Sequence, residues 1–123
     1  MELFTIKLGR QLGYQAQRAG ITVVDSTVKG KSLLFAPTWD IVMGHKNGTV
    51  SDQEYRDVYL AKMRQSWIDH RAAWEEFLRQ DGWVAIGCYC DPGCFCHRLI
   101  LVELFEMLCK KLDIPFTYYG EFQ

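Results

Sequence analysis

The chain has 123 residues, of which 49% are hydrophobic and 14% aromatic, and its formal net charge is −1 at pH 7. This length predicts one domain, residues 1–123, whose core needs no disulfide or metal to support it. The near-neutral charge excludes general nucleic-acid binding and adsorption to a membrane surface, because neither could rely on bulk electrostatic attraction. The first fifty residues nevertheless carry six Lys and Arg against three Asp and Glu, which leaves room for a local basic pocket.

The N-terminal segment, MELFTIKLGR, has too short an apolar run for a signal peptide, and no run approaches membrane-spanning length. We therefore expect a soluble cytoplasmic protein whose thiols stay reduced. The cysteines agree with this expectation, because their number is odd and four of the five lie within nine residues. Such crowding does not suit a disulfide framework that must span a fold.

The first part of the chain alternates between strand and helix patterns. Residues 3–8 (LFTIKL) alternate apolar and polar side chains, which predicts a strand. Residues 10–18 predict a short helix closed by a glycine. Residues 21–26 (ITVVDS) predict a second, interior strand.

The middle of the chain is predicted to be helical. Pro37 favours a helix start after it, and residues 39–43 form a short apolar helix or turn. Ser51 and Glu54 fit the capping-box pattern, so a long helix is expected to begin there and to break near Ser66 before a second helix. Apolar side chains at helical spacing are assigned to the core of the protein rather than to a stacking platform: Tyr55, Val58, Tyr59, Met63 and Trp67.

The last part of the chain predicts a strand over residues 83–89, a helix over about 96–112 and a final strand over 116–119. The apolar stripe of this helix is expected to comprise Leu99, Val102, Phe105, Leu108 and Cys109. Strands that alternate with helices indicate an α/β layered fold with a mainly parallel sheet.

Chemistry is concentrated between the last two of these elements, in residues 88–98. One interpretation is a metal site, because this segment supplies the soft ligands Cys88, Cys90, Cys94 and Cys96, and tetrahedral zinc needs four. The cysteines lack the C-x2-C spacing that places two sulfurs on one ion. A metal is therefore the less favoured alternative.

A second interpretation is a thiol enzyme with Cys96 as nucleophile and His97 as a further catalytic group. A cysteine at a helix N-terminus beside His97 and Arg98 has the surroundings that lower a thiol pKa. The phosphatase spacing of a cysteine, five residues and an arginine is absent.

A third interpretation is an anion-binding site. The loop that contains Gly93 ends at a helix start, which supplies free backbone N–H groups, and His97 and Arg98 add charge-assisted hydrogen bonds. Lys29 and Lys31 follow the second strand, and ligands of open α/β sheets bind beyond the carboxyl ends of strands. These lysines are a candidate opposite wall, with a solvated loop as the alternative.

A fourth interpretation is purely structural. Cys88 and Cys96 are then small buried side chains, the histidine bonds a backbone carbonyl, and Arg98 pairs with an acid such as Asp91 or Glu103. For each residue alone this explanation suffices, whereas the cysteine, histidine and arginine together at a strand–helix junction favour a functional site.

The sequence resembles the domain-of-unknown-function family numbered 488 from about residue 34 onward. The resemblance rests on Cys88-Tyr89, Pro92-Gly93, Phe95-Cys96-His97-Arg98, Ala36-Pro37-Thr38-Trp39 and GTVSDQEY at 48–55. It implies a compact three-layer, Rossmann-like α/β fold with a site around Cys88, Cys96, His97 and Arg98, and it implies no known reaction. Two departures stand out: Cys90 and Cys94 replace other polar residues, and an arginine common near the end of the second strand is missing, so that Lys29 or Lys31 would replace it.

The leading hypothesis is binding of a small anionic ligand, nucleotide-like or phosphorylated, at the junction formed by residues 88–98. His97 and Arg98 would donate to the anion, Cys88 and Cys96 would line the floor, and Lys29, Lys31 and Trp39 would close the opposite wall. The alternatives are a Cys/His-dependent enzyme acting on a related substrate, and an interaction or inhibitor protein, for which the small size of the domain suits a phage or mobile element. No cofactor and no oligomeric state is predicted.

Overall fold

A computed structural model describes residues 1–30, 33–91 and 94–123 of the protein. The described elements, in chain order, are β1 (Glu2–Lys7), α1 (Arg10–Arg18), β2 (Ile21–Asp25), α2 (Trp39–Lys46), α3 (Asp52–Asp69), α4 (Arg71–Arg79), β3 (Trp83–Cys88), α5 (His97–Lys111) and β4 (Thr117–Phe122).

The four strands form one sheet in the order β2-β3-β1-β4, and every neighbouring pair is parallel. The central strand β3 reads WVAIGC and is buried after its first residue, as expected for a parallel strand that is covered on both faces. Its last residues, Gly87 and Cys88, pair with Ile6 and Lys7 of β1. The α/β fold with a parallel sheet is thereby confirmed.

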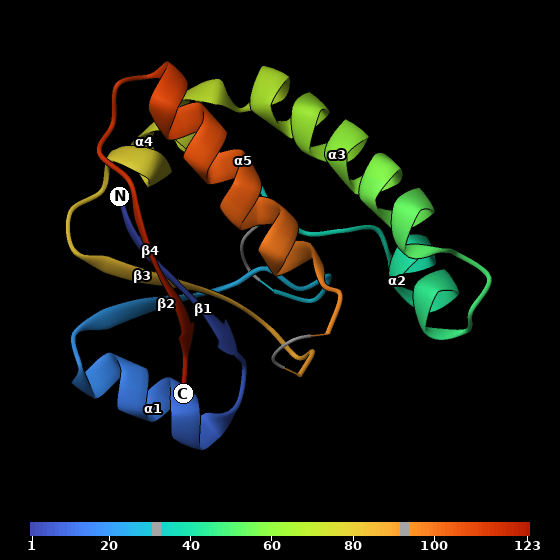
Figure 1. The fold of residues 1–123 in the computed structure, drawn as a ribbon, viewed down its shortest axis with the longest axis horizontal. Coiled ribbons are helices and arrows are strands. Elements are labelled where there is room, and N and C mark those ends of the chain that lie inside the picture. The colour runs from blue at the N-terminus through green and yellow to red at the C-terminus, as the bar shows by residue number, and fades with distance from the viewer. Residues whose placement is uncertain (31–32, 92–93) are drawn as a thin grey trace.

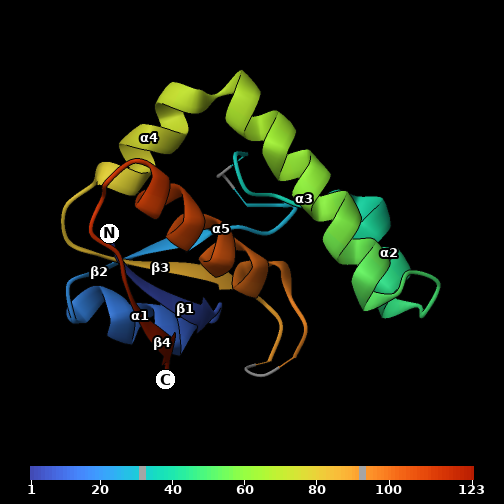
Figure 2. The same cartoon turned by 45° about the horizontal axis from the view of Figure 1, so that its top comes forward.

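Helices cover both faces of the sheet, which gives three layers (Figures 1 and 2). On one face lies α1, whose Ala16 packs with Ile6, Ile21 and Ala85 in a small core. On the other face lie α3, α4 and α5, and their larger core is built on aromatic rings. Phe35 is its centre, with ring centroids of Trp74 and Phe105 at 4.9 and 5.2 Å.

The long helix α3 begins as predicted, because Ser51 and Glu54 form a complete capping box. The predicted break near Ser66 is wrong, since the helix continues to Asp69 and the backbone leaves helical geometry at His70. Ser66 stays helical because its hydroxyl donates to the Leu34 carbonyl and accepts from the indole of Trp74.

Three further details differ from expectation. Helical spacing predicts that Val58 and Leu99 lie in the core, but they are 44% and 39% exposed, since each lies beside the apolar stripe of its helix rather than on it. The final strand begins at Thr117 and continues through Gly120, whose φ of 93° no side-chain-bearing residue readily adopts, to Phe122. This extension brings Glu121 into the sheet.

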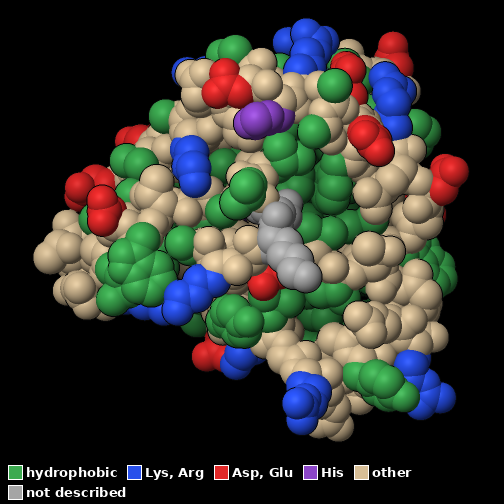
Figure 3. Space-filling view, turned by 180° about the vertical axis from the view of Figure 1, so that it is seen from behind, with side chains coloured by type: hydrophobic (Ala, Val, Ile, Leu, Met, Phe, Trp, Pro, Cys, Tyr) green, Lys and Arg blue, Asp and Glu red, His purple; other side chains and the backbone are tan. Residues whose placement is uncertain are grey.

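The surface of one face is shown in Figure 3, where hydrophobic side chains occupy much of the centre and charged side chains lie mainly around the margin. Within the described parts of the chain, no helix combines the length and apolarity needed to cross a membrane.

Candidate functional site

A cavity of about 320 Å³ lies beyond the carboxyl ends of β2 and β3, between α2, α3 and the start of α5. Its floor is formed by a histidine and three cysteines: Cys88, Cys90, Cys96 and His97. Aromatic side chains from α2, from α3 and from the loop between β3 and α5 line its walls: Trp39, Tyr55, Tyr89 and Phe95. The location agrees with the rule that ligands of parallel α/β sheets bind at the carboxyl ends of the strands.

The structure brings together five of the residues that the sequence singled out, namely Cys88, Cys96, His97, Lys29 and Trp39, all of which line this cavity. Lys31 and Gly93 lie outside the described residues. Cys94 is exposed and does not line the cavity. The four-cysteine metal set considered from sequence is therefore divided, because one of its members lies apart.

The ring of His97 is held in one orientation. Nε2 lies 2.9 Å from the backbone oxygen of Ser26, and this oxygen can only accept, so Nε2 carries the proton. The other nitrogen, Nδ1, keeps its lone pair toward the cavity floor, 3.4 Å from the hydroxyl of Tyr55 and 3.7 Å from Sγ of Cys96. Burial lowers the pKa of His97 to about 4, so the ring is neutral at pH 7.

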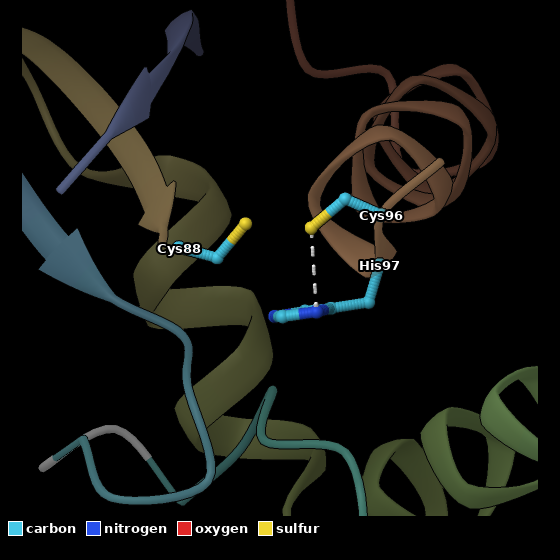
Figure 4. Close-up of side chains that lie close together, drawn as sticks. All are labelled: Cys88, Cys96 and His97. Atoms are coloured by element: carbon cyan, nitrogen blue, oxygen red, sulfur yellow. Dashed lines mark hydrogen bonds between the residues drawn. The ribbon is translucent and has the colours of Figure 1, made fainter. Parts of the chain in front are cut away.

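The thiols of Cys88 and Cys96 converge on this ring. Both side chains are almost fully buried, at 2% and 3% exposure, and their sulfurs and a ring nitrogen of His97 lie within 4.8 Å of one another. Figure 4 shows Cys88 reaching in from the end of β3, and Cys96 and His97 from the start of α5. All five cysteines are free, as the crowded spacing predicted.

The thiols differ in acidity in a way that the sequence did not indicate. Hydrogen bonds from Cys88 and Cys96 lower the pKa of Cys90, the least buried of the three. Hydrogen bonds with Cys88 and Cys90 raise the pKa of Cys96, and burial is the next cause. The pKa of Cys96 is therefore raised rather than lowered, contrary to what its place at a helix start predicts.

Arg98 lies beneath the loop that follows β3 rather than in the cavity. It is 2% exposed, and its Nη1 donates to Sγ of Cys88 and to the carbonyl of Cys90, both at 2.9 Å. Its Nη2 donates to Glu121 of β4 at 2.9 Å. The guanidinium therefore ties the loop to the sheet and does not line the cavity. Its buried Nε has no hydrogen-bond partner among the described residues.

The acid that pairs with Arg98 is neither of those suggested by the sequence. Asp91 forms an ion pair with Lys7, and Glu103 forms one with Arg56 at 2.6 Å. Glu121 was missed because it follows Gly120, where the predicted final strand had already ended.

Of the aromatic side chains that line the cavity, sequence reasoning placed Trp39 at the site and missed the other three. Tyr55 was assigned to the core, and it is 4% exposed, but its hydroxyl faces His97 and burial raises its pKa far above the usual value. The pattern of residues 45–48 (HKNG) predicts a loop, but His45 lies in α2 and lines the cavity. Asp52 holds its Nε2 at 2.5 Å, and the ring of Phe95 packs on it with centroids 5.1 Å apart. Helical spacing alone gives no signal that separates such a wall from ordinary core.

The opposite wall is formed by Lys29 and Trp39, with the Lys29 Nζ 5.6 Å from the centroid of the indole ring. The turn that carries Lys29 is ordered by Asp25, whose carboxylate accepts from the backbone N–H and hydroxyl of Thr27. Gly30 is required there, since a Cβ at this position would lie 2.6 Å from the Asp25 backbone oxygen.

These features define a class of protein: a parallel α/β domain in which a buried cysteine–histidine group forms the floor of a cavity with aromatic walls. The sequence model of DUF488-N3a, described as the active DUF488-N3 subclade, matches residues 6–108. The chain belongs to this family, which confirms the resemblance noted from its motifs. No curated protein and no solved structure matched the chain.

Proposed function

We propose that the cavity binds a small anionic ligand that contains a flat ring, such as a nucleotide-like compound. The observation that carries the proposal is the combination of aromatic walls with free lysines around one cavity. A volume of about 320 Å³ lies at the lower end of the range usual for small-molecule sites.

The ring of the ligand would lie against the aromatic side chains. Trp39 is 51% exposed and Tyr89 is 65% exposed, which is unusual for such large apolar groups. Phe95 and Tyr55 form a fixed edge-to-face pair on the other side, with centroids 5.4 Å apart. A planar ring between these walls would cover apolar surface that is otherwise in contact with water.

The anionic part of the ligand would bind at the lysines. Lys29 and Lys46 line the cavity, both are exposed, and among the described residues neither forms an ion pair. The sequence placed the anion on His97 and Arg98 instead. The one N–H of the neutral His97 ring is taken by the Ser26 carbonyl at 2.9 Å. Because Glu121, Cys88 and Cys90 already occupy the Nη1 and Nη2 donors of Arg98, the lysines are the better candidates.

The proposal is tested by calorimetric titration of the protein with nucleotides and with the matching nucleosides. We expect nucleotides to bind more tightly, and Lys29→Gln and Lys46→Gln each to weaken binding about tenfold, since each removes a charge-assisted hydrogen bond. Lys110→Gln, an exposed lysine in the last turn of α5, is the control and should leave the affinity unchanged. Equal affinity for nucleotides and nucleosides would refute the anion site.

The aromatic wall has its own test. Trp39→Leu should weaken the binding of every ring-containing ligand, whereas Trp83→Leu, at a similarly exposed tryptophan outside the cavity, should not. If the two variants lose affinity equally, the loss reflects general destabilisation and the ring is not bound against Trp39.

A second candidate function is a Cys/His-dependent enzyme. The observation that favours it is the orientation of His97, whose unprotonated Nδ1 faces Sγ of Cys96 while the Ser26 carbonyl holds the opposite nitrogen. The description of the subclade as active agrees with this candidate. Mass spectrometry of a bound nucleotide after incubation would detect conversion, and Cys96→Ser should abolish conversion while binding remains. Unchanged conversion by Cys96→Ser would exclude this thiol as nucleophile.

A further inference from the structure

We infer that the cavity floor is a zinc site, with Cys88, Cys96 and His97 as the protein ligands and a fourth coordination position open to the cavity. This inference goes beyond the proposed ligand binding. It also differs from the set suggested by the spacing of the cysteines, because His97 takes the place of Cys94.

The first support is the geometry of the donor atoms. The sulfurs of Cys88 and Cys96 and a ring nitrogen of His97 lie within 4.8 Å of one another, and Figure 4 shows the two sulfurs on the same side of the ring. Around tetrahedral zinc, bonds of about 2.0–2.3 Å place ligand atoms roughly 3.5 Å apart. The three groups therefore need to close by about 1.3 Å at most, which small rotations of the side chains can supply.

The second support is the orientation of His97. A ligating histidine usually donates its other ring N–H to a carbonyl or carboxylate, which fixes the ring toward the metal. Here Nε2 donates to the backbone oxygen of Ser26 at 2.9 Å and lies 3.0 Å from the Ser26 hydroxyl, which itself donates to the Gly87 carbonyl. The protein alone therefore orients the lone pair of Nδ1 toward the sulfurs, before any metal binds.

The third support is the charge around the sulfurs. Arg98 donates to Sγ of Cys88 at 2.9 Å, a contact that stabilises a thiolate, and Glu121 balances the charge of the guanidinium. Two thiolates neutralise one divalent cation. The sulfur–nitrogen donor set selects zinc over the hard cations magnesium and calcium. When zinc binds, each coordinating thiol releases its proton to solvent.

The fourth position distinguishes a catalytic from a structural zinc. Structural sites are closed by four protein ligands, whereas catalytic sites keep one position for water or substrate. Cys90 also lines the cavity, but it is only partly buried, and the group of donor atoms within 4.8 Å of one another comprises Cys88, Cys96 and His97 without it. We therefore place Cys90 near the ion but do not count it as a ligand, so that the fourth coordination position stays open to an anion that enters the cavity.

The test is metal analysis of protein purified without a histidine tag, followed by titration of the metal-free protein with zinc and with cobalt. We expect one zinc per chain, and a cobalt spectrum with a thiolate charge-transfer band and the visible bands of a four-coordinate ion. The cobalt spectrum is read on the unaltered protein, so it remains decisive if variants fold poorly. If neither zinc nor cobalt binds stoichiometrically, the inference is overturned.

Cysteine variants then assign the ligands. Cys88→Ser and Cys96→Ser should lose stoichiometric zinc, whereas Cys94→Ser and Cys109→Ser, the exposed thiol and a buried thiol elsewhere, should keep it. Cys90→Ser should also keep one zinc per chain. If Cys90→Ser loses the metal as completely as Cys88→Ser does, the site is a closed four-ligand site and the open position is refuted.

The same experiment separates this inference from the functions proposed above. Nucleotide titrations are made on both the metal-free and the zinc-loaded protein, so a failure of metal binding with intact nucleotide binding counts against the metal alone. A zinc-loaded site would leave neither Cys96 nor Nδ1 of His97 free. Stoichiometric zinc therefore also counts against the thiol enzyme.

Discussion

The buried pair of Arg98 and Glu121 should contribute far more to stability than its single contact suggests. The Arg98 side chain is 2% exposed and that of Glu121 is 15% exposed, with 2.9 Å between the paired atoms. Glu121→Gln keeps the shape and one acceptor oxygen but removes the charge. Because it leaves a buried guanidinium without its counter-charge, we expect a loss of about 2–3 kcal/mol in the free energy of unfolding.

The chain offers a matched control for this variant. Glu103 also pairs with an arginine, at 2.6 Å from Arg56, but the two side chains are 61% and 37% exposed. Glu103→Gln should therefore cost no more than about 0.5 kcal/mol, as is usual for pairs in water. Both variants are measured by urea unfolding, with tryptophan fluorescence as the signal and an unchanged dependence on urea as the check for two-state behaviour.

The outcome also bears on the site. If both variants lower the free energy of unfolding by the same amount, the guanidinium of Arg98 is not buried and is available to a ligand. A selective loss for Glu121→Gln, with nucleotide affinity unchanged under conditions where the variant is folded, would establish Arg98 as a group that positions the loop.

Four further substitutions test three local features. Ser51→Ala removes the capping box and should cost about 1 kcal/mol in thermal unfolding, so a neutral result would contradict the cap. Tyr59→Phe leaves the buried Phe35 carbonyl without its donor at 2.6 Å and should cost about 1–3 kcal/mol in urea unfolding, and a cost near zero would show that water replaces the hydroxyl. Gly48→Ala forces an alanine to a φ of 79° and should lower the free energy of unfolding by about 1 kcal/mol. Gly13→Ala lies in a helix with open space around it and should raise the free energy of unfolding by about 0.5–1 kcal/mol. If both changes have the same sign, the argument from backbone conformation is refuted.

Periodicity was sufficient to predict most of the fold. The helix predicted over residues 10–18 is α1 as observed, and the capping box located the start of α3 to the residue. Errors arose where a tertiary contact overrides a local signal. The pattern predicts a break near Ser66, but the hydroxyl of Ser66 bonds to Leu34 and Trp74 and the helix continues.

The candidate site was only partly accessible to sequence reasoning. Cys88, Cys96 and His97 are neighbours in the chain across one loop, so a strand followed by a helix was enough to place them together. Glu121 and Tyr55 come to the site from elements whose own patterns were already explained by strand and helix packing. A contact across the sheet or between helices leaves no periodic signal, and only the assembled layers reveal it.

The position of β1 in the sheet has a consequence for how the protein reaches its folded state. β1 lies between β3 and β4, so both of its hydrogen-bonding neighbours come from far later in the chain, and it does not pair with β2. A nascent chain that ends before β3 therefore has two strands that cannot form a sheet with each other. Assembly must wait for β3 to enter between them, which makes the folding of this small domain dependent on distant contacts and correspondingly slow.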